Sequence, residues 1–337
     1  MNLVKTSILT FIATVVRLSV SFIINKVLSI YTGPSGLAVM GQFQNILQIT
    51  LTASTGAINV GVTKYVSEYE HELDNKKEII AASLKISIVS SICTSILLLL
   101  FSNEISKHAL GNEGYSNIIL IFGCSIFLFS LNQLTLAILN GERKIQLYTK
   151  INILQSVISL LLSLVLVYFY QLYGALLALT INQSLVFILI LKVVLKEKIY
   201  SLSLLKKRLN SSVYRKLLKY SSMTMTTAII SPVVLMLIRD YISEELTLDY
   251  AGYWQGIYFL SATYLSLITT SLATYFLPKL SACKKNHEIA REIKGGLFLV
   301  VPLLIVITCL IYSFKELIVG FVFTPEFLPM VALFKYQ

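Results

Sequence analysis

Stretches of about 20 mostly apolar residues, the length that crosses a bilayer as a helix, recur along this chain from end to end. They predict helices at 7–30, 37–63, 80–101, 116–139, 148–170, 173–195, 215–238, 250–277, 291–313 and 316–334. The sequence is 56% hydrophobic and 13% charged, which leaves too few charges to cover a soluble globule of 337 residues. We therefore predict an all-α polytopic membrane protein with about ten spanning helices.

The basic residues are distributed unevenly over the connections between these helices. With the N-terminus inside, 23 of the 28 Lys and Arg residues, Lys335 among them, fall in cytoplasmic segments. Only Lys107, Arg239 and Lys315 fall on the opposite side. Because basic residues gather in cytoplasmic loops of membrane proteins, we predict a cytoplasmic N-terminus. The net charge of +11 then indicates orientation, and we expect no nucleic-acid partner.

The longest connection is rich in basic residues and divides the chain into two parts. It contains Lys206, Lys207 and Arg208, and a basic amphipathic segment of this kind is typical of a surface that lies on anionic lipid headgroups. We predict an N-terminal lobe of six helices at 1–196, a cytoplasmic linker at 197–214 and an incomplete C-terminal lobe of about four helices at 215–337.

A weak internal repeat supports this division. Placing Lys26 over Arg239 also places Gln42 over Gln255, with similar hydropathy around both pairs. Transporters are often built from such duplicated halves. Six helices in each half give both halves the same orientation, so the repeat predicts two lobes related by a parallel pseudo-twofold axis.

The sequence argues against an enzyme. The three histidines lie in predicted loops, and neither they nor the four cysteines have the spacing of a metal site. No GxSxG, HExxH or Walker A pattern occurs. We therefore predict no catalytic residues, no metal and no cofactor. The carboxylates near the outer connections, such as Glu104, Glu113 and Asp249, are interpreted as solvated loop charges.

Arg17 lies near the middle of the first apolar stretch. A guanidinium at the centre of a spanning helix costs about 2.5–3.5 kcal/mol on insertion scales. Arg cannot lose its proton, and the predicted spans offer no deep Asp or Glu as a partner. A cavity that holds an anionic ligand would offset this cost, so Arg17 is the leading candidate for a substrate contact.

Three further basic residues are candidate substrate contacts, each with a structural alternative. Lys26 lies nine residues after Arg17, about half a turn around the helix, so the two side chains should point different ways. Lys26 either lines the cavity or reaches to the interface. Arg239 either binds substrate or is neutralised by the adjacent Asp240. Lys64 lies at the inner end of the second span, where lysines ordinarily extend to the interface.

Amides are unusually frequent in the predicted spans. They suit contacts to sugar hydroxyls, although amides also join membrane helices to one another. The set comprises Asn25, Gln42, Gln44, Asn45, Asn132, Gln133, Asn152, Gln155, Asn182, Gln183 and Gln255.

Several motifs resemble the O-antigen translocase (Wzx) family. They are Gly33-Pro34-Ser35-Gly36-Leu37, Gly61-Val62-Thr63-Lys64-Tyr65-Val66, Gly252-Tyr253-Trp254-Gln255-Gly256 and Tyr275-Phe276-Leu277-Pro278-Lys279-Leu280. The resemblance implies a member of the multidrug/oligosaccharidyl-lipid/polysaccharide exporter superfamily, with twelve helices in two six-helix lobes. By that measure the chain would end about two helices early, and an inactive truncated member is one alternative.

The resemblance implies a flippase that moves undecaprenyl-diphosphate-linked oligosaccharide from the cytoplasmic to the periplasmic leaflet of the bacterial inner membrane. Membrane lipid is then a further partner, as are a polysaccharide polymerase and a chain-length regulator. An antiporter of organic cations in the same superfamily is the main alternative, and the basic, carboxylate-free spans disfavour it. A membrane-bound polysaccharide polymerase or ligase is another alternative.

Overall fold

A computed structural model describes residues 3–197, 199–200, 211–282 and 286–336, all of it helices and their connections. The helices are α1 (Leu3–Ser54), α2 (Asn59–Glu68), α3 (Leu73–Leu100), α4 (Ser102–Leu110), η1 (Glu113–Tyr115), α5 (Ser116–Gly141), α6 (Ile145–Lys196), α8 (Ser211–Glu245), α9 (Leu248–Ala282), α10 (Asn286–Ser313), α11 (Lys315–Val322) and η2 (Pro325–Tyr336). Within the described residues, six helices are long and apolar enough to cross a membrane. These helices confirm the predicted all-α polytopic membrane protein.

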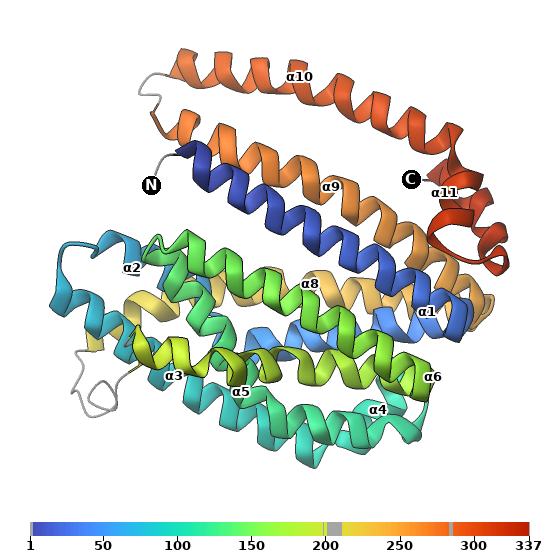
Figure 1. The fold of residues 1–337 in the computed structure, drawn as a ribbon, viewed down its shortest axis with the longest axis horizontal. Helices are drawn as coiled ribbons and strands as arrows, with labels where there is room; N and C mark the ends of the chain where they lie inside the picture. The colour runs from blue at the N-terminus through green and yellow to red at the C-terminus, as the bar shows by residue number, and fades with distance from the viewer. Residues whose placement is uncertain (1–2, 198, 201–210, 283–285, 337) are drawn as a thin grey trace.

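The two longest helices each contain two of the predicted spans. In α1 the helix is interrupted at Gly33, whose φ of 63° is open to glycine without strain, and Pro34 then fits the start of the next helix. In α6 the interruption is at Gln171, with φ 48°. At both points the chain reverses direction (Figure 1). Both reversals lie in the gaps between predicted spans, at 31–36 and 171–172.

The helix in the second predicted span, 37–63, is shorter than predicted. The helix ends at Ser54, and the following turn contains two residues with positive φ, Gly56 (65°) and Ala57 (55°). The separate helix α2 then begins at Asn59. Left-handed backbone conformations cannot continue an α-helix, which is why the span stops here.

The last predicted span, 316–334, is wrong as a continuous helix. After α11 the backbone is extended at Phe323, and the chain continues as the 3₁₀ helix η2, which begins at Pro325 and contains Pro329. Proline removes a backbone donor and clashes with the preceding turn, so an α-helix cannot run through this segment. Lys335 consequently lies beside Tyr312 and Ser313 at the end of α10, not on the cytoplasmic side as predicted.

Helix α1 is the junction of the molecule, since it packs against α6 on one side and against α9 on the other. One apolar core joins α1 to α3, α5 and α6 around Phe43 and Phe122. Another joins α1 to α9, α11 and η2 around Leu37, Phe323 and Phe327. Figure 1 shows the first half of α1 running beside α9. The division into two lobes stays a prediction, and most of its basic linker lies outside the described residues.

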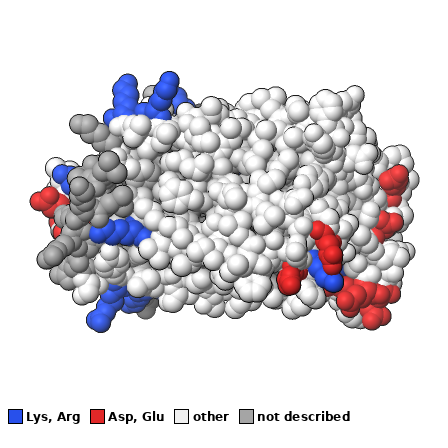
Figure 2. Space-filling model, turned by 90° about the horizontal axis from the view of Figure 1, so that it is seen from below, with Lys and Arg blue, Asp and Glu red and all other residues white. Residues whose placement is uncertain are grey.

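Charge separates the two ends of the molecule. Figure 2 shows a wide uncharged belt, with Lys and Arg gathered towards one end and most of the visible Asp and Glu at the other. The basic end contains the turns at 69–72 and 141–144, and the acidic end contains α4 and the turn between α8 and α9. An uncharged belt suits lipid, and by the positive-inside rule the basic end faces the cytoplasm.

Gly252 on α9 packs closely against the α1 turn. A Cβ atom on it would lie 1.9 Å from the Pro34 carbonyl oxygen, which is backbone and cannot swing aside. We expect Gly252→Ala to push the helices apart and lower the free energy of unfolding by about 1–3 kcal/mol, the usual cost of overpacking. Thermal unfolding in lipid nanodiscs measures this loss.

The matched control is Gly295→Ala on α10, because nothing lies within 4 Å of a Cβ there. Its unfolding temperature should stay the same or rise slightly, since alanine favours a helix over glycine. Equal unfolding temperatures for the two variants would show that α9 does not depend on this contact.

Candidate functional site

Arg17 lies midway along the first half of α1 and faces a cavity of about 450 Å³ between α1 and α6. We call it the Arg17 cavity. Its polar lining residues include Thr14, Arg17, Ser21, Asn25, Gln44, Tyr148, Thr149, Asn152, Gln155, Ser156, Ser159, Ser163 and Asn182. Its apolar lining comes from residues such as Val20, Ile24 and Leu179. No carboxylate is among the lining residues, so the cavity has a single formal charge, the guanidinium.

The Arg17 guanidinium is exposed to this cavity rather than bonded to protein. Within the described part of the chain it makes neither an ion pair nor a hydrogen bond, and its five N–H donors are available to a ligand. Lys26 does not line the same cavity. The prediction that these two residues point different ways is therefore confirmed.

Several amides of the first six predicted spans bond to one another across helices. Asn132 and Gln133 on α5 donate to Gln183 on α6 at 3.4 and 2.7 Å, and Asn132 also donates to Gln155 at 3.2 Å. These amides join α5 to α6, the structural role weighed in the sequence analysis. Asn182, by contrast, lines the Arg17 cavity, and its buried Oδ1 atom has no hydrogen-bond partner among the described residues.

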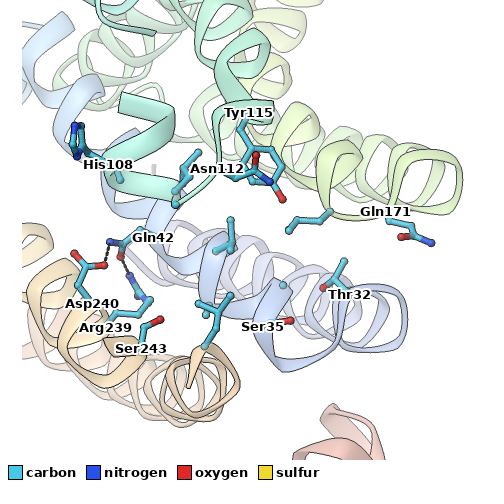
Figure 3. A pocket seen from close by; sticks show the side chains of 18 of the residues that line it. Thr32, Ser35, Gln42, His108, Asn112, Tyr115, Gln171, Arg239, Asp240 and Ser243 are labelled. Carbon is cyan, nitrogen blue, oxygen red and sulfur yellow. Dashed lines mark hydrogen bonds between the residues drawn. The ribbon is translucent and has the colours of Figure 1, made fainter. Parts of the chain in front are cut away.

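A second cavity, of about 680 Å³, lies at the acidic end between the α1 turn, α4, the α6 turn and the end of α8. We call it the outer pocket. Figure 3 shows Gln42 of α1 lying between Asp240 and Arg239 of α8, with His108 and Asn112 across the pocket. Its lining contains amides, hydroxyls and two tyrosines, and it differs from that of the Arg17 cavity in having two carboxylates, Asp240 and Glu244.

Arg239 is buried at the base of the outer pocket, with 3% of its surface exposed. Its Nη1 atom donates to Gln42 and its Nη2 atom donates to Gln255 at 2.6 Å, while Nε has no partner. Gln42 in turn donates to Asp240 at 2.8 Å. The Trp254 ring lies 5.5 Å from the guanidinium carbon, close enough for a cation–π contact. These five residues tie α1 to α8 and α9.

Lys26 holds the end of α11. Its Nζ atom donates to the Gly320 carbonyl at 3.0 Å and to the Phe323 carbonyl. The last carbonyls of a helix have no partner within it and attract a positive charge. Lys26 therefore gives these carbonyls a donor and joins α1 to the C-terminal segment.

Lys64 lies at the basic end, on α2. Its Nζ atom donates to the Tyr220 hydroxyl of α8 at 2.7 Å, and this hydrogen bond raises the pKa of Lys64. The four candidate contacts thus occupy four different places. The structure brings none of them together, and of the four only Arg17 faces open space without a protein partner among the described residues.

Sequence reasoning missed the role of two glutamines. The repeat placed Gln42 over Gln255, and in the structure both amide oxygens accept from the same Arg239 guanidinium. Gln255 is buried on α9 and packs against Gly41 of α1. A Cβ atom on residue 41 would lie 2.4 Å from the Gln255 side chain, so glycine allows α9 to approach α1 closely here. Such a meeting of distant residues has no signature in a single sequence.

Comparison with known proteins places this architecture. Residues 45–332 match the profile of a family described as "Polysaccharide biosynthesis protein". The chain belongs to this family. Proteins named "Lipid III flippase" from Escherichia coli K12 and from Shigella flexneri are each 26% identical to it over 341 aligned residues, covering 100% of the chain and 81% of the relative.

This polysaccharide biosynthesis protein shares its fold with transporters of the MOP superfamily. The inward-facing structure of a multidrug resistance MATE family transporter matches 96% of the chain and 79% of its own length, with a TM-score of 0.76 and 13% identity. A MOP superfamily transporter from Pyrococcus furiosus, reported to have a binding pocket of reverse polarity, matches with a TM-score of 0.68 and 15% identity, over 100% of this chain and 75% of its own. The predicted class, a multi-pass membrane transporter rather than an enzyme, is confirmed.

Proposed function

We propose that this protein translocates undecaprenyl-diphosphate-linked oligosaccharide from the cytoplasmic to the periplasmic leaflet of the bacterial inner membrane, for surface polysaccharide synthesis. The family match and the flippase relatives support the substrate class. The observation that carries the proposal is the Arg17 cavity. Its one charge is a guanidinium without a protein partner in the described residues, and neutral polar groups surround it.

A diphosphate suits this cavity better than an organic cation does. Guanidinium and phosphate form paired charge-assisted hydrogen bonds, which are shorter and stronger than neutral ones. Amides such as Asn152 and Asn182 line the same cavity and can bond sugar hydroxyls. A cation would meet the positive charge of Arg17 with no carboxylate among the lining residues to offset it. The polyprenyl tail would remain in lipid.

Movement of the substrate would require two lobes that alternately open at each end. We propose that residues 1–196 and 215–337 form these lobes and that 197–214 links them. At the acidic end, both of these basic side chains bond to the other proposed lobe: Arg239 donates to Gln42, and Lys26 donates to the Gly320 carbonyl. They would assist the diphosphate, as the sequence suggests, only after those contacts break. Lys64, at the basic end, would meet the substrate earliest.

Further partners follow from the proposed pathway rather than from the geometry. An oligosaccharide delivered to the periplasmic leaflet must be joined to others, so a polysaccharide polymerase and a chain-length regulator would act on the product. Membrane lipid is the other partner, and the uncharged belt in Figure 2 supports its contact with the protein.

Complementation in a bacterial strain that lacks its own flippase tests the function. Expression of this chain should restore surface polysaccharide and lower the amount of lipid-linked intermediate held in the cytoplasmic leaflet. Resistance to cationic drugs in the same strain, without any change in surface polysaccharide, would instead favour the organic-cation antiporter. A product assembled while the intermediate still accumulates inside would favour the polymerase or ligase.

A further inference from the structure

Two lysines from opposite parts of the chain meet on a cluster of tyrosines at the basic end. We call five residues the Lys–Tyr cluster: Lys64 and Tyr65 on α2, Tyr69 directly after α2, and Lys216 and Tyr220 on α8. Lys64 donates to the Tyr220 hydroxyl and Lys216 donates to the Tyr69 hydroxyl, both at 2.7 Å. One bond joins α2 to α8 and the other joins α8 to the turn after α2, so each lysine is held in place by the neighbouring segment.

Tyr65 lies at the centre of the cluster. The Nζ atoms of Lys64 and Lys216 lie 5.1 and 6.0 Å from its ring centroid. Its ring stacks on Tyr69, with centroids 6.3 Å apart and planes at 15°, and meets Tyr220 edge-on at 5.7 Å. The aromatic rings are half-buried and Tyr65 and Tyr69 pack on the apolar core, so they form a fixed base beneath two exposed ammonium groups.

The charges of this cluster are not balanced by ion pairs. Salt bridges such as those of Lys76 and Lys144 with Glu142 occur nearby, and among the described residues neither Lys64 nor Lys216 takes part in one. Among the described residues, Glu68 is the carboxylate that acts on both lysines, while Arg215 and Lys219 on α8 add further positive charge. An ammonium has three donors, and each lysine uses one on a tyrosine. Four N–H donors therefore remain for an anion.

The position of the cluster limits which ligands could reach it. It lies where α2 meets α8 at the basic end, where the uncharged belt stops and a lipid headgroup would lie. We propose that the Lys–Tyr cluster binds a lipid phosphate at the cytoplasmic membrane surface. The phosphate belongs either to an anionic phospholipid or to a polyprenyl diphosphate. The second identification rests on the function proposed above, because it makes the cluster the first contact of the substrate.

Protection of the lysines from amine labelling tests the proposal. The full chain in phosphatidylcholine nanodiscs is labelled with an amine-reactive reagent, and mass spectrometry quantifies modification at each lysine. Undecaprenyl diphosphate or phosphatidylglycerol is added in separate arms. We expect at least one of these lipids to slow labelling of Lys64 and Lys216 several-fold. Lys77, an exposed lysine on α3 without a contact to the cluster, is the internal control.

A double variant, Lys64→Gln with Lys216→Gln, should bind the protecting lipid about tenfold or more weakly, as expected for lost charge-assisted contacts. Lys77→Gln with Lys219→Gln removes the same charge outside the tyrosine contacts and should bind nearly as the parent does. Protection by undecaprenyl diphosphate alone identifies the substrate, whereas protection by phosphatidylglycerol identifies a structural lipid. Equal labelling with and without both lipids would overturn the site.

The outcomes separate this site from the proposed function. Protection without complementation of a flippase-deficient strain would leave the phosphate site in place and remove the flippase. Complementation without protection would support the flippase and remove the phosphate site. Equal weakening in both double variants would show that general positive charge, not the tyrosine-held pair, attracts the lipid, and it too would overturn the proposal.

Discussion

Arg17→Ala should reduce translocation of the lipid-linked oligosaccharide at least tenfold. The substitution removes the only formal charge among the lining residues of the Arg17 cavity. A hydrogen bond to a charged group contributes about 1.5–3 kcal/mol, which corresponds to roughly a 10- to 150-fold change in affinity. The measurement is surface polysaccharide in a flippase-deficient strain that expresses the variant at the parental level. Purified protein should unfold at an unchanged or slightly higher temperature, because no described protein group loses a partner.

Two further variants separate charge, geometry and helix packing. Arg17→Lys keeps the charge but loses the paired donors of the guanidinium, so its activity should lie between those of the parent and Arg17→Ala. Val15→Ala is the matched control, since Val15 is exposed on the same helix and does not line the cavity. It should complement fully. Full surface polysaccharide with Arg17→Ala would remove Arg17 from the mechanism.

Arg239→Ala should destabilise the protein and open the acidic end. The variant leaves the carbonyl oxygens of Gln42 and Gln255 without their donor and leaves Asp240 without its neighbouring positive charge. Gln42 and Gln255 are buried, and leaving a buried acceptor without a donor costs about 1–3 kcal/mol. The unfolding temperature in nanodiscs should fall clearly, in contrast to Arg17→Ala.

Thiol labelling reports whether the outer pocket opens. In a cysteine-free background, Ser243→Cys places a thiol in that pocket on α8, where a membrane-impermeant maleimide reaches it from the periplasmic side. Labelling should be several-fold faster when Arg239→Ala is added. Arg215→Ala, an exposed arginine on the same helix, should alter neither property. Lost transport with unchanged stability and labelling would mean that Arg239 contacts substrate and does not tie the helices together.

The fold could be predicted from the sequence to the extent that each span depends on its own residues. Apolar length determined the helices, and the gap between the predicted spans 7–30 and 37–63 coincides with the reversal in α1 at Gly33. The failures lie where local backbone chemistry outweighs hydropathy. The turn at Gly56 and Ala57 ends a helix inside a predicted span, and prolines 325 and 329 break the last one although its hydropathy suits a membrane.

The candidate site, too, could be predicted from the sequence only in part. The isolated charge of Arg17 was visible in the sequence, because the cost of a guanidinium in an apolar span and the absence of deep carboxylates both follow from composition. The sequence likewise determined that Lys26 points elsewhere, since the helical repeat fixes the angle between them. The sequence did not predict the binding partners of Lys26, Lys64 and Arg239.

Tertiary structure alone decided those partners. Lys26 meets carbonyls almost 300 positions away, and Arg239 meets Gln42 from the first helix. A single sequence contains hydropathy and spacing, which act along one helix, whereas these contacts depend on which helices pack together and at what depth. The sequence by itself therefore determined a membrane protein with one unpaired deep charge, and the packing of α1 between α6 and α9 decided which of the other charges are bound to protein.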